Sequence, residues 1–259
     1  MSKLHLLIVC FLVLALGLTG CSWENHLAQK DGKTANLSSV PTNKPSTGPS
    51  KNSSSIQNDT SIQVVSNPGI IPVLVNKHNM LPDGYNPSDL VDPNIPFIFE
   101  KKLEKRKMRT AAAAAIEKLF AGAKQDGVSL LGVSAYRSHA TQVSLFNYYV
   151  KEDGYDEART YSAVPGTSEH ETGLAIDVTG GNGKCAAEEC FEGTLEAEWL
   201  QKYAADYGFI IRYPKGKDSI TGYQYEPWHL RYVGKPIAKE IMSRGITLEE
   251  YYNASPVNN

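Results

Sequence analysis

The chain has 259 residues, with 26 lysines and arginines against 28 aspartates and glutamates, and a formal net charge of −2. This balance gives no excess of basic residues that could bind a phosphate backbone, so it excludes nucleic acid as a partner. The part with globular character, from about residue 66 to residue 252, falls within the size of one domain, and we expect a monomer.

The amino terminus reads as an export signal. Residues 1–18 contain one early charge, Lys3, followed by an apolar run that leads into Thr19-Gly20-Cys21. An apolar segment of this length before small residues is typical of a signal peptide rather than a membrane span. The Leu-x-Gly-Cys ending resembles a bacterial lipobox, which implies removal of residues 1–20 and acylation of Cys21. Acylation would anchor the protein stably to the membrane. An uncleaved anchor and plain secretion are the alternatives, and all three place the remaining chain outside the cytoplasm.

Residues 21–65 form the second segment. Ser, Asn, Thr, Pro and Lys dominate it, and its apolar residues follow neither a helical nor a strand period. Such a composition buries too little apolar surface to offset chain entropy, so we predict a disordered tether. A tether lets a globular domain range away from a lipid surface, although a generic spacer has the same composition.

The cysteines divide by position. Cys10 lies in the predicted signal and Cys21 is the predicted lipid acceptor, which leaves Cys185 and Cys190 around the sequence AAEE. In an oxidising compartment, and with no further thiol or nearby histidine to complete a metal site, the pair favours a local disulfide. Free thiols are the alternative.

Helices and strands alternate irregularly along the remaining chain. Helical spacing is clearest over 102–125, where AAAAAIEKLFAGAK lies near the centre and Gly127 follows as a stop. Apolar runs bounded by turn residues predict the strands, and three-to-four-residue spacing predicts the other helices. The predicted strands are 70–76, 130–134, 209–212 and 223–233, and the other helices are 140–150, 156–162, 195–207, 237–244 and 248–252. This order predicts an α+β domain with a mainly antiparallel sheet flanked by helices.

The segment 166–177, GTSEHETGLAID, contains a histidine and an aspartate seven residues apart, His170 and Asp177. A helix would separate them by about 10.5 Å along its axis and an extended strand by roughly 23 Å. Two ligands of one zinc ion lie only about 3–3.5 Å apart, so neither regular geometry brings both to one ion. A turn at Thr172-Gly173 would do so, and we predict a histidine–turn–strand–aspartate arrangement.

A second segment, EPWH at 226–229, adds Glu226 and His229. Two imidazole nitrogens, one carboxylate oxygen and a vacant fourth position make a catalytic rather than a structural zinc site, although His-Asp-His also accommodates other divalent metals. Glu226 remains free to transfer protons. In a regular strand Glu226 and His229 would point to opposite faces, so we predict a bulge or strand end at Pro227.

Three groups of residues together resemble a family. They are Ser134-Ala-Tyr-Arg-Ser138 followed by Gln142, the motif SxHxxGxAxD at 168–177, and EPWH. In this order they are similar to the zinc D-alanyl carboxypeptidases of bacterial peptidoglycan, in the VanY-like and LdcB-like branch. The resemblance covers nearly all of residues 74–252. It implies the compact α+β fold of the hedgehog signalling domain and of the vancomycin-resistance dipeptidases, and makes residues 66–259 the zinc carboxypeptidase domain.

The family's functional residues carry over by position. Its zinc ligands fall on His170, Asp177 and His229, its catalytic base on Glu226, and its substrate-clamping arginine on Arg137. Three further polar residues match positions that line the substrate groove in relatives: Ser138, Gln142 and Ser168. The planar fork of Arg137 suits either a terminal carboxylate or an oxyanion, and a structural ion pair is its alternative role.

The resemblance implies a peptidoglycan stem peptide as substrate and Zn²⁺ as cofactor. The expected reaction removes the terminal D-alanine, by cutting either the L,D bond of the tetrapeptide or the D-Ala-D-Ala bond of the pentapeptide. Because lipoprotein relatives often show the L,D activity, we expect that activity here, on analogy alone. A wall endopeptidase on the same scaffold and a non-catalytic wall-binding lipoprotein are the alternatives. Glu226 argues against the last, because binding alone needs no base.

Overall fold

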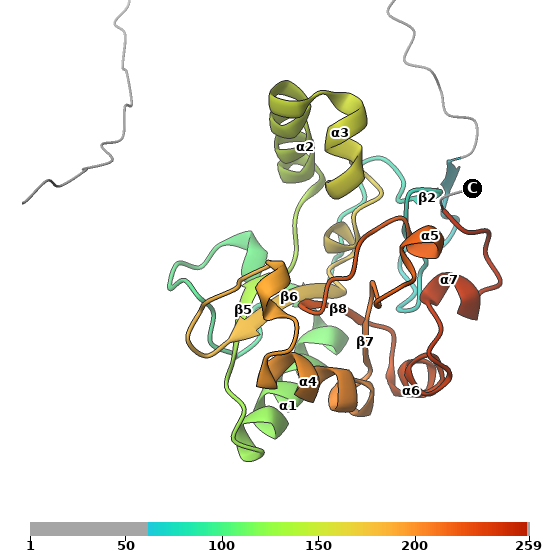
Figure 1. Cartoon of the computed structure of the whole chain (residues 1–259). Helices are drawn as coiled ribbons and strands as arrows, with labels where there is room; N and C mark the ends of the chain where they lie inside the picture. The colour runs from blue at the N-terminus through green and yellow to red at the C-terminus, as the bar shows by residue number, and fades with distance from the viewer. Residues whose placement is uncertain (1–61, 258–259) are drawn as a thin grey trace, which may run out of the picture. The chain divides into compact units, whose positions relative to one another are not determined.

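A four-stranded sheet forms the centre of the protein in the computed structural model, which describes residues 62–257 (Figure 1). In spatial order its strands are β5 (Leu130–Ser134), β6 (Ala175–Gly180), β8 (His229–Tyr232) and β7 (Phe209–Ile211). All three neighbouring pairs are antiparallel. The predicted α+β fold with a mainly antiparallel sheet is therefore confirmed.

Two short ribbons accompany this sheet. Strand β1 (Gln63–Val64) pairs in parallel with β2 (Asn79–Met80), and β3 (Leu90–Val91) pairs antiparallel with β4 (Met108–Arg109). The last residues of the predicted tether thus take part in β1. The predicted signal peptide, the rest of the tether and Cys21 lie outside the described residues. Among residues 62–257, no helix has the length and apolar character needed to cross a bilayer.

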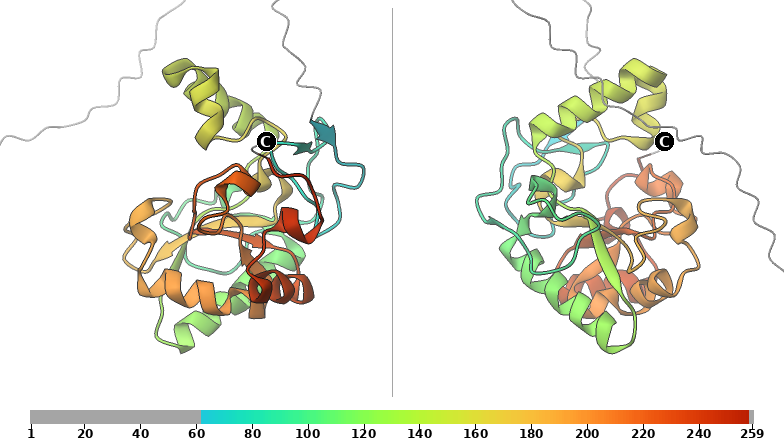
Figure 2. Two further views of the ribbon diagram at one scale, coloured as in Figure 1. Left: turned by 45° about the vertical axis from the view of Figure 1, so that its right-hand side comes forward. Right: turned by 90° about the vertical axis from the view of Figure 1, so that its left-hand side faces the viewer.

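The five longest α-helices lie in two groups (Figures 1 and 2). The elements α1, α4 and α6 gather on one side of the sheet, and α2 and α3 form a separate pair beyond its opposite side. The α-helices are α1 (Thr110–Gln125), α2 (His139–Asp153), α3 (Tyr155–Tyr161), α4 (Leu195–Tyr203), α5 (Asp218–Thr221), α6 (Lys235–Arg244) and α7 (Leu248–Tyr251). Four 3₁₀ turns complete the elements: η1 (Glu104–Arg106), η2 (Glu169–Thr172), η3 (Glu189–Phe191) and η4 (Ala204–Tyr207).

Helix α1 supplies one wall of the main core. Ala112, Ile116, Leu119 and Ala123 recur at helical spacing, and all four are completely buried. Gly122 lets η4 approach closely, because a Cβ at this position would lie 1.9 Å from the Tyr207 hydroxyl oxygen. The small residues of α1 therefore allow the elements on this side of the sheet to pack closely against α1.

Three predicted elements are shorter than expected or absent. The helix predicted over 102–125 begins only at Thr110, because Met108 and Arg109 pair with β3. The strand predicted over 223–233 is confined to β8. The strand predicted over 70–76 is wrong, since this segment forms turns and irregular chain. There, the carbonyls of Ile71 and Val73 accept hydrogen bonds from the buried Arg231 side chain rather than from a neighbouring strand.

Candidate metal and catalytic site

His170, Asp177 and His229 meet at the centre of the sheet. They come from η2, β6 and β8, and each offers one ligand atom within 4.8 Å of the others. Asp177 and His229 are directly opposite each other in the antiparallel register. His229 Nδ1 lies 2.9 Å from Asp177 Oδ1, and His170 Nε2 lies 3.4 Å from Asp177 Oδ2. All three side chains are buried.

A tight turn brings His170 and Asp177 to one point. The 3₁₀ turn η2 is followed by Gly173, whose φ is 67°, and β6 begins two residues after this glycine. A Cβ at Gly173 would lie 2.8 Å from Leu90 Cδ2, so glycine serves both the left-handed conformation and the packing. The predicted histidine–turn–strand–aspartate arrangement is confirmed.

The EPWH segment turns before it enters the sheet. The Glu226 amide donates to the Tyr213 carbonyl, and the His229 amide donates to the Glu226 carbonyl at 3.1 Å. Strand β8 begins only at His229, so Pro227 and Trp228 precede it. The strand end predicted at Pro227 is confirmed. Glu226 and His229 consequently face the same space, with 3.8 Å between Glu226 Oε2 and His229 Nδ1.

Hydrogen bonds fix which histidine nitrogens face the cluster. His170 Nδ1 lies 2.7 Å from the Ala135 carbonyl oxygen, which can only accept, so this nitrogen carries the proton and Nε2 faces Asp177. His229 Nε2 lies 3.4 Å from Glu169 Oε2, which leaves Nδ1 toward Asp177. A carboxylate or carbonyl behind each imidazole is the usual support of a metal-binding histidine.

The charges of the cluster fit a cation. Burial and the nearby Arg137 lower the pKa of His170 to about 4, against the pull of Asp177, so its imidazole is neutral. Burial opposes protonation of His229, but hydrogen bonds with Asp177 and Glu169 raise its pKa to about 10. Positive charge is thus stabilised between His229 and Asp177. Two nitrogens and one carboxylate are donors that suit zinc, and Zn²⁺ would replace that proton.

Glu226 is suited to proton transfer. Burial raises the pKa of Glu226 to about 7, Asp177 and Glu169 add to the rise, and His229 opposes it. Its side chain is still 25% exposed, so water can reach it. A carboxyl group with a pKa near neutrality is effective as both a general base and a general acid.

Sequence reasoning missed a buried acid beside the cluster, Glu169. Its carboxylate is fully buried and accepts from Arg212 Nε at 2.7 Å and from Arg231 Nη1 at 2.6 Å. Arg212 in turn forms a two-bond pair with Glu249, which also accepts from Asn76. Burial opposes ionisation of Glu169, but the two arginines hold its pKa well below the ordinary range. The sequence feature that could have pointed to Glu169 is its position directly before His170 in the motif.

Arg137 lines the same space as the cluster. Its Nη1 donates to Gln142 Oε1 at 2.8 Å, and Gln142 in turn donates to the Ala163 carbonyl. Among the described residues Arg137 has no carboxylate within ion-pair distance, which disfavours a purely structural ion pair. Its guanidinium is therefore oriented by a neutral amide and keeps its charge for another anion.

The candidate site borders a cavity of about 300 Å³. Ser168 lines it together with the cluster, Glu226 and Arg137. Gln142 is fully buried behind Arg137, and Ser138 caps α2 by accepting from the Thr141 amide, so neither lines the cavity. The predicted Cys185–Cys190 disulfide is present, and Ala187 within its loop borders the cavity.

The chain is similar to known carboxypeptidases in sequence and in fold. The family model described as "VanY: D-alanyl-D-alanine carboxypeptidase" matches residues 105–235. A putative carboxypeptidase of Bacillus subtilis, YodJ, is 43% identical over 90% of each chain. The LD-carboxypeptidase LdcB, whose structure is solved, is 46% identical, with a TM-score of 0.73 over 75% of this chain and 91% of that chain. A vancomycin-resistance D,D-pentapeptidase VanY mutant solved with Zn(II) is 32% identical, with a TM-score of 0.58 over 71% of this chain and 99% of that one.

Proposed function

Because this chain belongs to the VanY family of D-alanyl-D-alanine carboxypeptidases, we propose that it is a zinc-dependent carboxypeptidase that removes the terminal D-alanine from peptidoglycan stem peptides. The observation that carries the proposal is the convergence of His170, Asp177 and His229 beside Glu226 and Arg137. Among the described residues, Arg137 has no carboxylate within ion-pair distance. A metal cluster with an adjacent base and a free cation is what hydrolysis next to a terminal carboxylate needs.

His170 Nε2, an Asp177 oxygen and His229 Nδ1 would hold the zinc ion. A bound zinc ion supplies a Lewis acid that polarises the scissile carbonyl and makes water a nucleophile near neutral pH. Glu226 accepts a proton from the attacking water and delivers it to the leaving amine, which its pKa of about 7 favours in both directions. Arg137 binds the terminal carboxylate of the substrate.

The specificity proposed is for the L,D bond of the tetrapeptide. In support, LdcB, described as an LD-carboxypeptidase, is 46% identical with a TM-score of 0.73, against 33% and 0.58 for VanYB in complex with D-alanine-D-alanine. The test is mass spectrometry of defined tri-, tetra- and pentapeptides after incubation with the zinc-loaded protein. Loss of one alanine from the tetrapeptide is expected. Cleavage of the pentapeptide alone would make the enzyme a D,D-carboxypeptidase, and release of larger fragments would make it an endopeptidase.

We also propose that the protein acts outside the cytoplasm, anchored through acylated Cys21. The support is the Leu-Thr-Gly-Cys sequence after an apolar run. Mass spectrometry of the mature amino terminus should find a diacylglycerol thioether on Cys21, and a Cys21→Ser variant should leave the membrane fraction. An unmodified cysteine in the mature protein would overturn this proposal.

The activity should depend on pH through Glu226. Burial raises its pKa to about 7, and only the ionised form accepts a proton, so kcat/KM should rise as pH increases through that region. A bound cation nearby favours the carboxylate and would shift this limb below 7. The measurement is a pH profile of kcat/KM on the preferred peptide between pH 4 and 9. A profile that falls over that limb would contradict the role of Glu226 as base.

Replacing Arg137 should weaken recognition of the substrate's carboxylate. Charge-assisted hydrogen bonds contribute about 1.5–3 kcal/mol, so Arg137→Gln should lower kcat/KM by about 10- to 100-fold. The check compares binding of a stem peptide with that of its C-terminal amide. Wild type should prefer the free acid and Arg137→Gln should not. A variant that still prefers the acid to the wild-type extent would remove Arg137 from carboxylate binding.

A further inference from the structure

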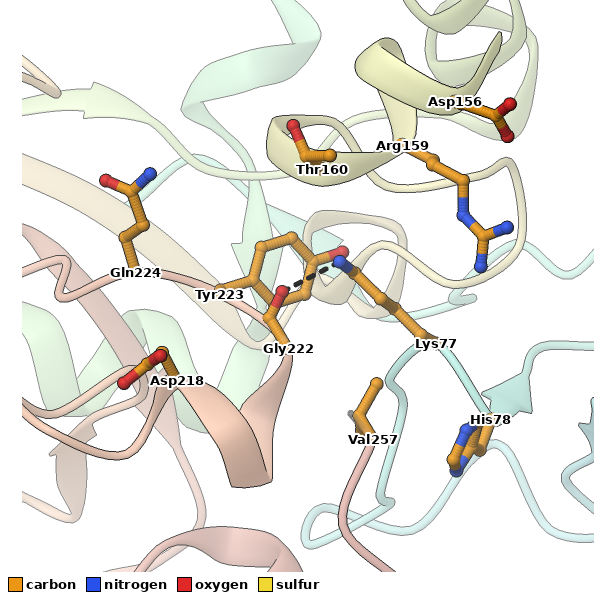
Figure 3. Close-up of a pocket in the computed structure, with 10 residues that line it drawn as sticks. All are labelled: Lys77, His78, Asp156, Arg159, Thr160, Asp218, Gly222, Tyr223, Gln224 and Val257. Atoms are coloured by element: carbon orange, nitrogen blue, oxygen red, sulfur yellow. Dashed lines mark hydrogen bonds between the residues drawn. The ribbon is translucent and has the colours of Figure 1, made fainter. Parts of the chain in front are cut away.

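Figure 3 shows a second cavity, of about 510 Å³. It adjoins the catalytic cavity. Tyr223 lines both. A third hollow connects them, because it shares Tyr161, Glu226 and Trp228 with the catalytic cavity and Thr160 and Gln224 with the second cavity. A substrate whose terminal residue lies at the metal cluster therefore has a continuous surface leading toward the second cavity.

Lys77 is held rigidly in this cavity. Its turn is fixed by Asn76 Oδ1, which accepts from the amides of His78 and Asn79, each at 3.0 Å. Lys77 Nζ donates to the Gly222 carbonyl at 2.7 Å and lies 4.6 Å from the centre of the Tyr223 ring. Much of the entropy cost of immobilising a lysine side chain is thus already met before a ligand binds.

The two cations of the cavity, Lys77 and Arg159, form no direct ion pair with a described residue. Arg159, from α3, extends toward the same space as Lys77 (Figure 3). Neither has a carboxylate within 4.0 Å in the part of the chain that the structure describes, although Asp156 and Asp218 also line the cavity. Burial and then repulsion from Arg159 lower the pKa of Lys77. An anion between the two cations would relieve that repulsion.

The Tyr223 hydroxyl is a further unused donor. Tyr223 is only 7% exposed, yet its hydroxyl has no hydrogen-bond partner among the described residues. A buried polar group without a partner costs free energy, which a ligand or an ordered water recovers. The two cations beside this hollow are donors suited to a carboxylate.

We propose that the second cavity binds a side-chain or α-carboxylate of the substrate peptide on the amino-terminal side of the scissile bond. This inference rests on the proposed function, since it takes the catalytic cavity as the place of the terminal residue. Lys77 and Arg159 then determine specificity: they select stem peptides whose acidic residue is free over those in which it is amidated.

The test uses two synthetic tetrapeptide stems that differ only in a free or an amidated carboxylate on the acidic residue. Steady-state kinetics on the zinc-loaded protein give KM for each. Wild type should show about a tenfold lower KM for the free acid, the size expected of one charge-assisted contact. Arg159→Gln and Lys77→Met should bring the ratio near one, and Arg159→Glu should invert it. Lys118→Met removes an exposed charge from α1 and should keep the wild-type ratio.

Binding separates failure of this inference from failure of the proposed function. If wild type cleaves neither peptide, the proposed function fails, and calorimetric titration with the same two peptides still tests the cavity. Tighter binding of the acid by wild type, lost in Arg159→Gln, supports it. Equal KM or equal affinity for the two peptides in wild type overturns it, whether or not either peptide is cleaved.

Discussion

Glu226→Gln should lower kcat by about 10²- to 10⁴-fold, the range contributed by a positioned acid–base group. Glutamine keeps the size of the side chain but cannot accept the proton that the pKa of about 7 allows glutamate to accept. Glu226 lies 3.8 Å from His229 Nδ1 and is not one of the three clustered donors, so zinc should still bind with a stoichiometry of one. The measurement is single-turnover hydrolysis of the preferred peptide, with zinc content determined on the same sample.

The matched control is Glu192→Gln. Glu192 forms an exposed ion pair with Lys215 and does not line the catalytic cavity. Its replacement should leave kcat within about twofold of wild type, because exposed ion pairs contribute little. Full activity in Glu226→Gln with zinc bound would refute the assignment of the base. Loss of zinc from that variant would make Glu226 a ligand instead.

Glu169→Gln should lower both the free energy of unfolding and the affinity for zinc. Removing one partner of a buried ion pair typically costs about 3–5 kcal/mol, because the remaining charge is left uncompensated. Here Arg212 would keep only Glu249, and Arg231 would lose the one carboxylate with which it pairs among the described residues. The His229 imidazole would also lose its carboxylate support, and such changes lower metal affinity by about 10- to 100-fold. Urea unfolding and competition with a zinc chelator measure the two effects.

Lys239→Ala is the control, because it removes an exposed ion pair and leaves the buried network around Glu169 intact. The Lys239–Asp206 pair is exposed, with side chains 60% and 54% accessible, and should contribute less than about 1 kcal/mol. The stability of Lys239→Ala should therefore be close to wild type, and its zinc affinity unchanged. If Glu169→Gln were as stable as wild type and bound zinc equally well, Glu169 would have no positioning role.

Local sequence predicted how His170, Asp177 and His229 are each positioned, because each half of the cluster is a short-range feature. Gly173 signals the turn that lets His170 approach Asp177, and Pro227 signals the strand end before His229. What joins the halves is cross-strand pairing of β6 with β8, which places Asp177 opposite His229. That pairing could be expected from the resemblance but not from spacing, since loops between strands leave the register open.

The buried charge network could not be predicted in the same way. Glu169 lies 43 residues from Arg212 and 62 from Arg231. The local sequence around each of these three residues is typical of an ordinary charged surface residue. Tertiary contacts also decided against the predicted strand at 70–76, where Pro72 lacks a donor and Arg231 takes the carbonyls of Ile71 and Val73. Val73 and Val75 are buried there although the segment forms turns and irregular chain, a distinction that periodicity does not make.

The most direct test of the whole account is a crystal of the zinc-loaded protein measured at the zinc absorption edge. The account predicts one anomalous peak about 2 Å from His170 Nε2, an Asp177 oxygen and His229 Nδ1, with no other protein atom bound to it. A peak elsewhere, or a peak whose fourth ligand is a side chain of this chain, would contradict it.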